Sequence, residues 1–558
     1  MRDKLLAGLL KIGAGAAAAA FVGKRADERL RLSRAKHRSL IGHVRMAKRV
    51  AGLVPHYEFA SDEFFRADGA PGEVVARREA GFERLAALYR ERFPKTTALT
   101  AEMRESIPDI AFTGRYRVPF PFSRFVRENL PSGSFYESAE GVMLTDLDGN
   151  RFYDLTGSYG VNLLGTDAYK QMVAEGIANT GALGPVLGGL HPVIADNVRR
   201  LRALSGLDAV SFHMSGTEAV MQAVRLARYH TRRSHVVRFA GAYHGWWGDV
   251  QPGIGNPVPA DRTYTLADMS EQTLEVLATR RNIACVLVNP LQAMHPNSSA
   301  PGDSALVASG GRKGGVARED YSRWLARLAE VCRKAGIVLI MDEVFTGFRL
   351  APGGACEYYG IRPDLVTYGK TLGGGLPVGV LCGRADLMRR YREDRPADIC
   401  FARGTFNSHP YVMGAMDAFL RWHASAEAEA AYNGLDERWN ARAAALNARL
   451  IAEGLSPRVA NLGTIWSIGY TKPSRYNWML QYYLRAEGLA LGWTGSGRLI
   501  FSMAIGEEEF AGIADRIVGA TQRWEQDGWV WAPEGGGNRA LNGQFLRETL
   551  VRGLLGRR

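Results

Sequence analysis

Cysteine is scarce in this sequence, and its cysteines are not paired. The 558 residues include five cysteines, an odd number, and no two of them form a Cys-x-x-Cys motif. This pattern argues against a disulfide framework and against a structural zinc site. We therefore expect a chain without a bound metal in a reducing compartment such as the cytoplasm.

A long uninterrupted hydrophobic run is also lacking. The chain opens with MRDKLLAGLLKIGAGAAAAAFVGKR, which has the charged start and apolar stretch of a signal peptide, but Lys11 interrupts it. The unbroken part, residues 12–23, is shorter than the roughly 20 residues that a bilayer-crossing helix needs. The segment is therefore not predicted to cross a membrane.

Acidic residues are scarce at the N-terminus. The whole chain has a net charge of +13, and residues 1–50 contain 13 Lys and Arg against 3 Asp and Glu. We expect a basic arm over residues 1–50, with three alternatives: a solvated segment, a peripheral contact with an anionic membrane, or a cleaved secretion signal. No zinc-finger, RNP or helix-turn-helix pattern accompanies the charge, so nucleic-acid binding is not predicted.

The rest of the chain has the composition of a large soluble enzyme, 46% hydrophobic and 23% charged. Short apolar runs alternate with helical patterns, which is typical of an α/β fold with a mostly parallel sheet. These runs are 209–212, 236–239, 285–288, 337–341, 365–368 and 379–382. We expect six parts: a basic arm (1–50), a helical extension (51–118), a segment with a β-hairpin (119–180), a large domain (181–416), a small α+β domain (417–533) and a basic tail (534–558).

One stretch, residues 336–379, places an acid and a lysine at the ends of two apolar runs. Asp342 follows the run 337–341, and Lys370 lies between the run 365–368 and a glycine cluster. Pyridoxal phosphate chemistry requires this pair, because a lysine amine forms a Schiff base with the cofactor aldehyde and an acid keeps the pyridine nitrogen protonated. The alternative is an ordinary strand end and a solvated surface lysine.

A second motif follows the apolar run 209–212. Ser215, Gly216 and Thr217 open a helical pattern, EAVMQAVRLARYH. Backbone N–H groups and a hydroxyl at a helix N-terminus bind anions, so a phosphate site is expected there. The alternative is an ordinary helix cap with Glu218 in the first turn.

Further polar and aromatic residues follow the other runs. Tyr243 and His244 come after 236–239, where an aromatic ring can stack on a pyridine or can simply pack on the core. Gln292 is placed to bond the phenolic oxygen of the cofactor, and Thr405 adds another hydroxyl.

The order of these motifs carries a resemblance. SGTEA, YHG, Pro-x-Gln, DEV, a lysine before GGG, and GTF occur together as they do in the class III aminotransferases of PLP fold type I. Over residues 119–523 the chain is similar in particular to the glutamate-1-semialdehyde 2,1-aminomutases. The resemblance implies a large pyridoxal 5'-phosphate domain with a mostly parallel seven-stranded sheet, a small C-terminal α+β domain, and a homodimer with shared active sites.

The resemblance also implies a role for each matching residue. The expected cofactor residues are Lys370 as Schiff-base lysine, Asp342 as pyridinium partner, Val344 behind the ring, Ser215, Gly216 and Thr217 around the phosphate, Tyr243 stacked on the ring, His244 at its edge, Gln292, and Thr405 on the phosphate of the neighbouring subunit. The expected substrate residues are Arg124, for a carboxylate, and Tyr159, in place of an entrance tryptophan.

Several residues depart from the aminomutase pattern. Asn289-Pro290 replaces Glu-Pro, Trp246-Trp247 replaces small residues, and Gly497 or Arg498 stands where those enzymes have a glutamate. Residues 296–319 are expected to form a long loop. Three hypotheses follow: an aminomutase, a transaminase for an aldehyde or ketone such as a lipid- or polyketide-like one, or a non-catalytic scaffold with the same fold.

Overall fold

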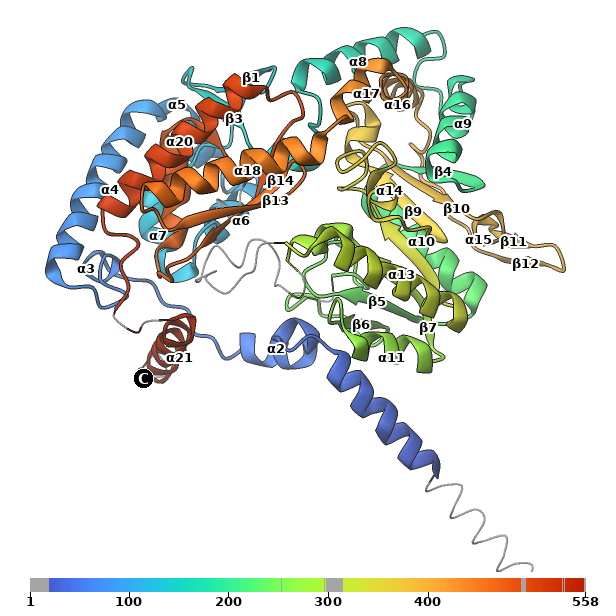
Figure 1. The fold of residues 1–558 in the computed structure, drawn as a ribbon, viewed down its shortest axis with the longest axis horizontal. Coiled ribbons are helices and arrows are strands. Elements are labelled where there is room, and N and C mark those ends of the chain that lie inside the picture. Colours follow the sequence, from blue (N-terminus) through green and yellow to red (C-terminus); the bar gives the residue numbers. More distant parts are fainter. Residues whose placement is uncertain are drawn as a thin grey trace, which may run out of the picture.

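A seven-stranded sheet forms the centre of the molecule (Figure 1). The computed structural model describes residues 20–251, 253–295, 297, 315–492, 498–533, 535 and 537–555. Along the sheet the strands are β4 (Ala209–His213), β10 (Gly379–Gly383), β9 (Leu365–Gly369), β8 (Val338–Asp342), β7 (Ile283–Val288), β5 (His235–Phe239) and β6 (Thr263–Leu266). The expected seven-stranded, mostly parallel sheet is confirmed, and β6 is a strand that the sequence analysis did not predict.

The strand directions decide which loops meet. Strand β10 is antiparallel to both β9 and β4, whereas β9, β8, β7, β5 and β6 are parallel to their neighbours. Strand β4 therefore runs in the same direction as β9. The carboxyl ends of six strands lie at one edge of the sheet, which is where ligands bind in such folds.

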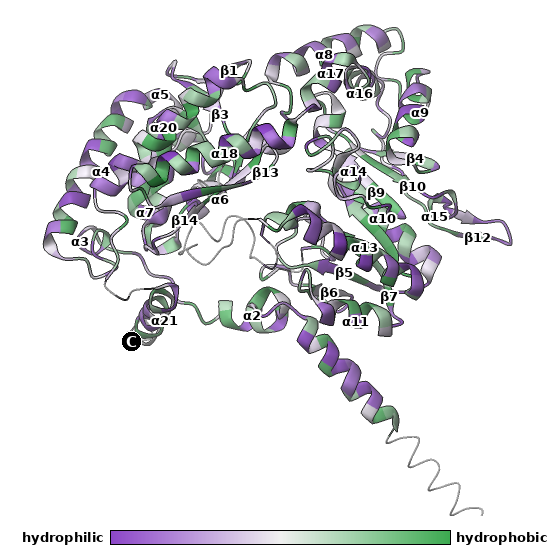
Figure 2. Ribbon diagram, in the orientation of Figure 1, coloured by the Kyte–Doolittle hydropathy of each residue, from purple (hydrophilic) through white to green (hydrophobic). Residues whose placement is uncertain are grey.

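Both faces of the sheet are covered, because successive side chains of a strand point to opposite sides. Val338 and Ile340 of β8 pack in the cluster that includes helix α10 (Gly216–Thr231). Leu339 and Met341 pack in the cluster that includes α13 (Arg318–Ala335) and α16 (Pro410–His423). Figure 2 shows hydrophobic residues along α10 and the central strands, and hydrophilic residues on α13. The continuous apolar runs of the sequence follow from this double burial.

The remaining helices of this part surround the sheet, and a two-stranded ribbon projects from it (Figure 1). The helices are α8 (Thr166–Thr180), α9 (Val193–Ser205), α11 (Glu271–Thr279), α14 (Gly354–Tyr359), α15 (Ala385–Met388) and α17 (Ala426–Tyr432), and the ribbon is β11 (Tyr391–Arg392) with β12 (Arg395–Ile399). The expected boundary at residue 417 falls inside α16, which packs on α8.

The N-terminal extension and the C-terminal segment share a second core. The N-terminal part contributes the helices α3 (Ser61–Phe64), α4 (Gly72–Arg92), α5 (Pro94–Met103), α6 (Pro108–Tyr116) and α7 (Phe120–Asn129), and the strands β1 (Tyr136–Glu140), β2 (Met143–Asp146) and β3 (Arg151–Asp154). Strand β15 (Leu489–Ala490) of the C-terminal segment completes the sheet β1-β2-β3-β15. The C-terminal segment contributes α18 (Leu435–Ala452), α19 (Leu480–Ala486), α20 (Glu507–Gln526), and the sheet β13 (Pro457–Leu462), β14 (Ile465–Tyr470) and β16 (Leu499–Ile500). Residues separated by more than 400 positions therefore form one hydrophobic unit.

The described residues of the arm and of the tail lie at the edges of these cores, and Ala35 of the arm packs in the core of the large sheet. In the arm, residues 20–35 form a helix that extends away from the body, and α2 (Val44–Ala51) follows it (Figure 1). The Ala267 N–H donates to the Ala35 carbonyl at 2.8 Å, which attaches the arm to the loop after β6. The tail forms α21 (Asn538–Leu555). Within the described ranges, no helix is long and apolar enough to cross a membrane. Residues 1–19 of the arm, and 296 and 298–314 of the expected loop, lie outside the described residues.

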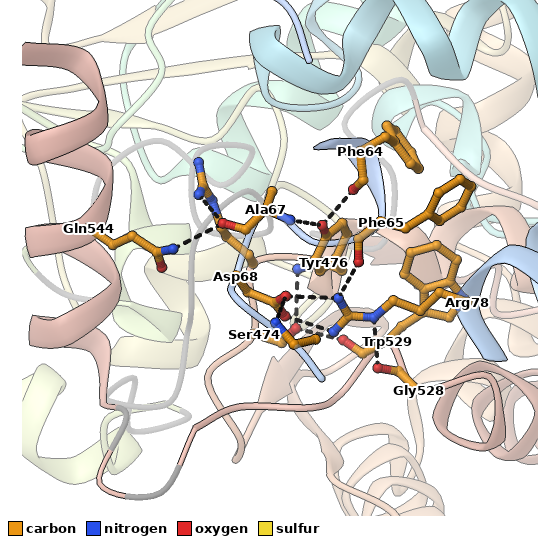
Figure 3. A network of polar contacts seen from close by, with 12 residues as sticks. Phe64, Phe65, Ala67, Asp68, Arg78, Ser474, Tyr476, Gly528, Trp529 and Gln544 are labelled. Atoms are coloured by element: carbon orange, nitrogen blue, oxygen red, sulfur yellow. Dashed lines mark hydrogen bonds and ion pairs between the residues drawn. The ribbon is translucent and has the colours of Figure 1, made fainter. Parts of the chain in front are cut away.

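The buried Arg78 side chain joins the N-terminal extension to the C-terminal segment (Figure 3). The Arg78 guanidinium donates to both carboxylate oxygens of Asp68, at 2.8 and 2.7 Å, and to the carbonyls of Phe65 and Gly528. The same guanidinium lies 4.3 Å from the ring centroid of Tyr476. Because the two charges are fully enclosed, removing one leaves the other uncompensated.

We expect Arg78→Ala to lower the free energy of unfolding by about 3–5 kcal/mol, as for the loss of one partner of a buried pair. The matched control is Arg90→Ala on the same helix, because the Arg90–Glu83 pair is exposed and contributes about 0–1 kcal/mol. Denaturant unfolding of both variants measures the difference. Equal losses would contradict the anchoring role of Arg78.

Candidate active site

The loops at the carboxyl edge of the sheet bring the predicted motifs together. Asp342 is the last residue of β8, Lys370 follows β9 directly, and Ser215 lies two residues after β4. Tyr243 follows β5, and Gln292 lies in a short 3-10 helix after β7. Five strands of one direction therefore deliver these side chains to one edge.

The Asp342 carboxylate is buried and held on several sides. It lies 2.7 Å from Nδ1 of His244, accepts from the Thr367 hydroxyl at 3.1 Å, and accepts from the Val344 N–H at 3.2 Å. His244 is also buried, and its Nε2 atom has no partner among the described residues. The carboxylate is thus fixed in position, and a second buried titratable group lies against it.

Lys370 has the chemistry of a nucleophilic amine. Its backbone is in the left-handed region at φ 51°, which is unusual for a residue with a side chain. Burial, and then the Arg349 guanidinium, lower the pKa of Lys370 to about 8, with a smaller effect from Arg498 and an opposing one from Asp342. A pKa near 8 leaves a far larger fraction of neutral amine at physiological pH than the ordinary value of about 10.4 does.

The N-terminus of α10 forms a tight cradle. The Ser215 hydroxyl accepts the Glu218 N–H at 3.2 Å and so caps the helix. A Cβ atom on Gly216 would overlap Val344, and one on Gly379 would overlap the Ser215 carbonyl. Gly245, at φ +91°, lies against the side chain of Thr217. Glycine is required at these positions because the segments approach so closely.

The residues expected beside a cofactor ring differ in burial and in hydrogen bonding. The Tyr243 side chain is exposed, and its carbonyl accepts from the Asn289 amide at 3.0 Å. Asn289, one of the departures in the sequence, thus holds the Tyr243 loop. The Gln292 side chain is buried and donates to the Ala240 carbonyl. That bond uses an amide hydrogen that a ligand would otherwise accept.

The residues expected to bind the substrate or to reach the neighbouring subunit's site have different surroundings. Arg124 on α7 is 65% exposed and pairs with Glu128 at 2.9 Å and with Glu58 at 3.5 Å. These contacts do not connect it to Lys370. Tyr159 is half exposed at φ 54°, next to Gly160, where a Cβ atom would meet Lys370. Thr405 is exposed on the loop before α16.

Two arginines near Lys370 were not assigned a role from the sequence. Arg349 is fully buried, and its guanidinium donates to the carbonyls of Gly160 and Asn162 at 3.0 and 2.9 Å. Arg498 lies 5.9 Å from the ring centroid of Phe345, and burial lowers its pKa to about 10. No ion pair neutralises Arg498 within the described part of the chain. Two features of the sequence could have drawn attention to them: the motif FTGFR, which ends in Arg349, and the position where Arg498 stands in place of the glutamate of the aminomutases.

A known enzyme family matches most of this chain. The profile of the Aminotransferase class-III family matches residues 126–520. The chain belongs to the class-III aminotransferases. Members of this family depend on pyridoxal phosphate, and the expected resemblance is confirmed.

Individual relatives agree with this assignment. The glutamate-1-semialdehyde 2,1-aminomutase of Desulfotalea psychrophila is 35% identical over 305 residues, covering 51% of this chain and 65% of the relative, slightly less than two thirds of its length. Glutamate-1-semialdehyde 2,1-aminomutase 2 of Brevibacillus brevis is 34% identical over 374 residues, covering 66% of this chain and 80% of the relative. A solved structure described as a transaminase with PLP bound aligns with a TM-score of 0.59 at 26% identity, covering 75% of this chain and 99% of that one.

The lowered pKa of this class-III aminotransferase's Lys370 gives a testable pH dependence. In protein prepared without cofactor, acetylation of Lys370 should reach half its maximal rate near pH 8, well below the ordinary lysine value of about 10.4. Arg498→Met should move the Lys370 midpoint upward, because a nearby cation that disfavours the protonated amine is removed. Competitive labelling with mass spectrometry measures both midpoints, and a native Lys370 midpoint in the ordinary lysine range would contradict the prediction.

Proposed function

We propose that this protein transfers an amino group to an aldehyde or ketone by means of pyridoxal 5'-phosphate. The observation that carries the proposal is the pairing of a lysine of lowered pKa with the buried Asp342–His244 pair at one sheet edge. The close packing at Gly216, Gly245 and Gly379 supports the fit, since a Cβ atom at any of these positions would collide with Val344, Thr217 or the Ser215 carbonyl and displace the segments around the N-terminus of α10. When bound, the cofactor supplies an aldehyde for the amine and a ring that accepts electrons from the substrate carbon.

Each residue around the cradle has a task in this proposal. Ser215, Gly216 and Thr217 would hold the phosphate at the positive end of α10. Asp342, oriented by His244, would hold the proton of the ring nitrogen. Lys370 would supply the amine that holds the cofactor aldehyde, and the same amine would accept and return the proton of the substrate carbon. Val344 packs behind the ring, because it already lies against Gly216.

Arg498 supports a transaminase with a carboxylate-bearing amino donor. Its guanidinium is desolvated, and an incoming carboxylate would supply the charge partner that the described residues do not. It stands in the stretch where the aminomutases have a glutamate, which would repel the same carboxylate. Trp246, exposed beyond Tyr243, supports an apolar acceptor such as a lipid- or polyketide-like carbonyl.

The aminomutase remains a second candidate, favoured by identities of 34–35% to curated aminomutases. Two assays on the loaded enzyme distinguish the reactions. Isomerisation of glutamate-1-semialdehyde without any second substrate supports the aminomutase. Amino transfer from glutamate or alanine to a panel of aldehydes, lost in Arg498→Met, supports the transaminase.

Lys370→Ala should abolish turnover and retain non-covalent cofactor, because the nucleophile is lost while the phosphate cradle is intact. Borohydride should fix the cofactor to the native chain only, as measured by protein mass.

Asp342→Asn should bind cofactor and lose on the order of 10²-fold in rate, because a neutral amide cannot hold the ring proton. A native rate in either variant would exclude the assigned role, and failure of the native chain to bind the cofactor would support the scaffold alternative.

We also propose a homodimer with shared sites. The loop that carries Thr405 exposes Phe401 and Phe406, two large apolar side chains that a second subunit would cover. In this arrangement Thr405 bonds the phosphate in the site of the neighbouring subunit.

Mixing Lys370→Ala subunits with Thr405→Ala subunits should restore activity. Hybrid dimers would contain one site with both an intact lysine and an intact threonine from opposite chains. Rates measured after verified subunit exchange test this. Activity that stays at the sum of the two parents would place Thr405 in the site of its own subunit or outside any site.

A further inference from the structure

The aromatic ring of Phe345 lies close to three cationic groups. Its centroid is 5.5 Å from the Lys370 Nζ atom, 5.8 Å from the guanidinium carbon of Arg349 and 5.9 Å from that of Arg498. All three distances are within the roughly 6 Å over which the face of an aromatic ring attracts a cation. The ring therefore contacts the amine and also the two guanidiniums that lower the pKa of that amine.

The turn that carries Phe345 is held by contacts of its own. It follows β8, and the Gly347 N–H donates to the Glu343 carbonyl at 2.8 Å. The Glu343 carboxylate is buried and accepts the Ala355 N–H and, at 2.7 Å, the Cys356 N–H at the start of α14. The turn is thus closed at its base and attached to the next helix, while Phe345 itself is only partly buried.

A second segment of the chain packs directly on the ring. Gly160 has φ +100°, and a Cβ atom there would lie 2.7 Å from both Cδ2 and Cε2 of Phe345 and 3.1 Å from Cδ of Lys370. The Gly160 carbonyl also accepts from the Arg349 guanidinium at 3.0 Å. Because glycine has no side chain, the backbone can approach this closely, and it holds the lysine stem and the ring against one segment.

The charges around Lys370 are unequal in number. The guanidiniums of Arg349 and Arg498 disfavour its protonated form, and the Asp342 carboxylate favours it. That carboxylate also lies against a buried histidine. The face of an aromatic ring carries partial negative charge, so Phe345 adds an attraction for the ammonium on the side where the guanidiniums repel it.

We propose that Phe345 is a positioning residue that holds the protonated Lys370 amine against its ring and so sets the proportion of charged amine in the site. Without the ring, the two arginines would keep the amine neutral down to a lower pH, and a neutral amine has no proton to return. With the ring, both forms exist near neutral pH, as a group that accepts and donates protons requires. The inference goes beyond the proposed function, because it concerns the free amine and does not depend on which amino transfer the protein catalyses.

Graded fluorination of the Phe345 ring in the full chain tests this proposal. Fluorine withdraws electron density from the ring face and changes the ring's size little, so mono-, di- and trifluorinated phenylalanine should weaken the contact with the ammonium stepwise. In cofactor-free protein, the acetylation midpoint of Lys370 should fall below its native value near pH 8 in the same order. Phe345→Leu should lower the midpoint by about half a pH unit to one pH unit, opposite in direction to Arg498→Met.

The matched control is the same fluorinated series at Phe348, three residues along the chain. Its ring is buried against Tyr368 and Phe419, so fluorination there should leave the Lys370 midpoint at its native value. Phe345→Tyr keeps the aromatic face and should also give a midpoint close to the native one. A midpoint that does not respond to fluorination of Phe345, or responds equally to fluorination of Phe348, would overturn the proposal. So would a midpoint raised by Phe345→Leu, because the ring would then act only by excluding water from the amine.

Discussion

A single buried guanidinium, that of Arg349, ties the architecture of this protein to the reactivity of its lysine. It donates to Gly160 and Asn162 after the hairpin, and to Thr464 and Phe501 in the C-terminal segment. Burying a cation costs several kcal/mol unless hydrogen bonds replace its hydration. The charge is therefore tolerated only when the hairpin segment, the sheet and the C-terminal segment are assembled around it.

The same guanidinium has a chemical consequence. Arg349 has no acid partner among the residues that the structure describes, so its charge acts on its surroundings and helps to lower the pKa of Lys370. Asp342 is the acid that opposes it, and Asp342 is already engaged with His244. The site thus has an excess of positive charge around the Lys370 amine. Such a balance favours anionic ligands, namely a phosphate in the α10 cradle and a carboxylate near Arg498.

The N-terminal extension is part of the second hydrophobic core. Arg78 and the aromatic rings around it join the extension to the C-terminal segment, so the second core is complete only with residues from both. This arrangement joins α3 to α21 through the ion pair between Glu63 and Arg552.

The sequence alone determined the strands that are covered on both faces and the two residues that pyridoxal phosphate chemistry requires. The apolar runs predicted β4, β5, β7, β8, β9 and β10, because strands covered on both faces read as continuous hydrophobic segments. The Asp342 and Lys370 pair followed from the needs of cofactor chemistry, and both lie at the carboxyl edge of the sheet. Strand β6, with the alternating sequence TYTL, has too few apolar residues to be recognised in the same way.

Only the tertiary structure decided which polar groups meet. Arg124 was expected at the substrate, and its contacts in the structure are with Glu128, one turn along the same helix, and with Glu58 in the segment before α3. Gln292 is bonded to a backbone carbonyl, and Arg349 and Arg498 lie beside Lys370. The one-letter pattern records residue type and spacing, whereas burial, pKa and ion pairing depend on neighbours that are distant in sequence. The sequence therefore sufficed to select Lys370, whereas its lowered pKa depends on the burial and the neighbouring charges that only the folded protein provides.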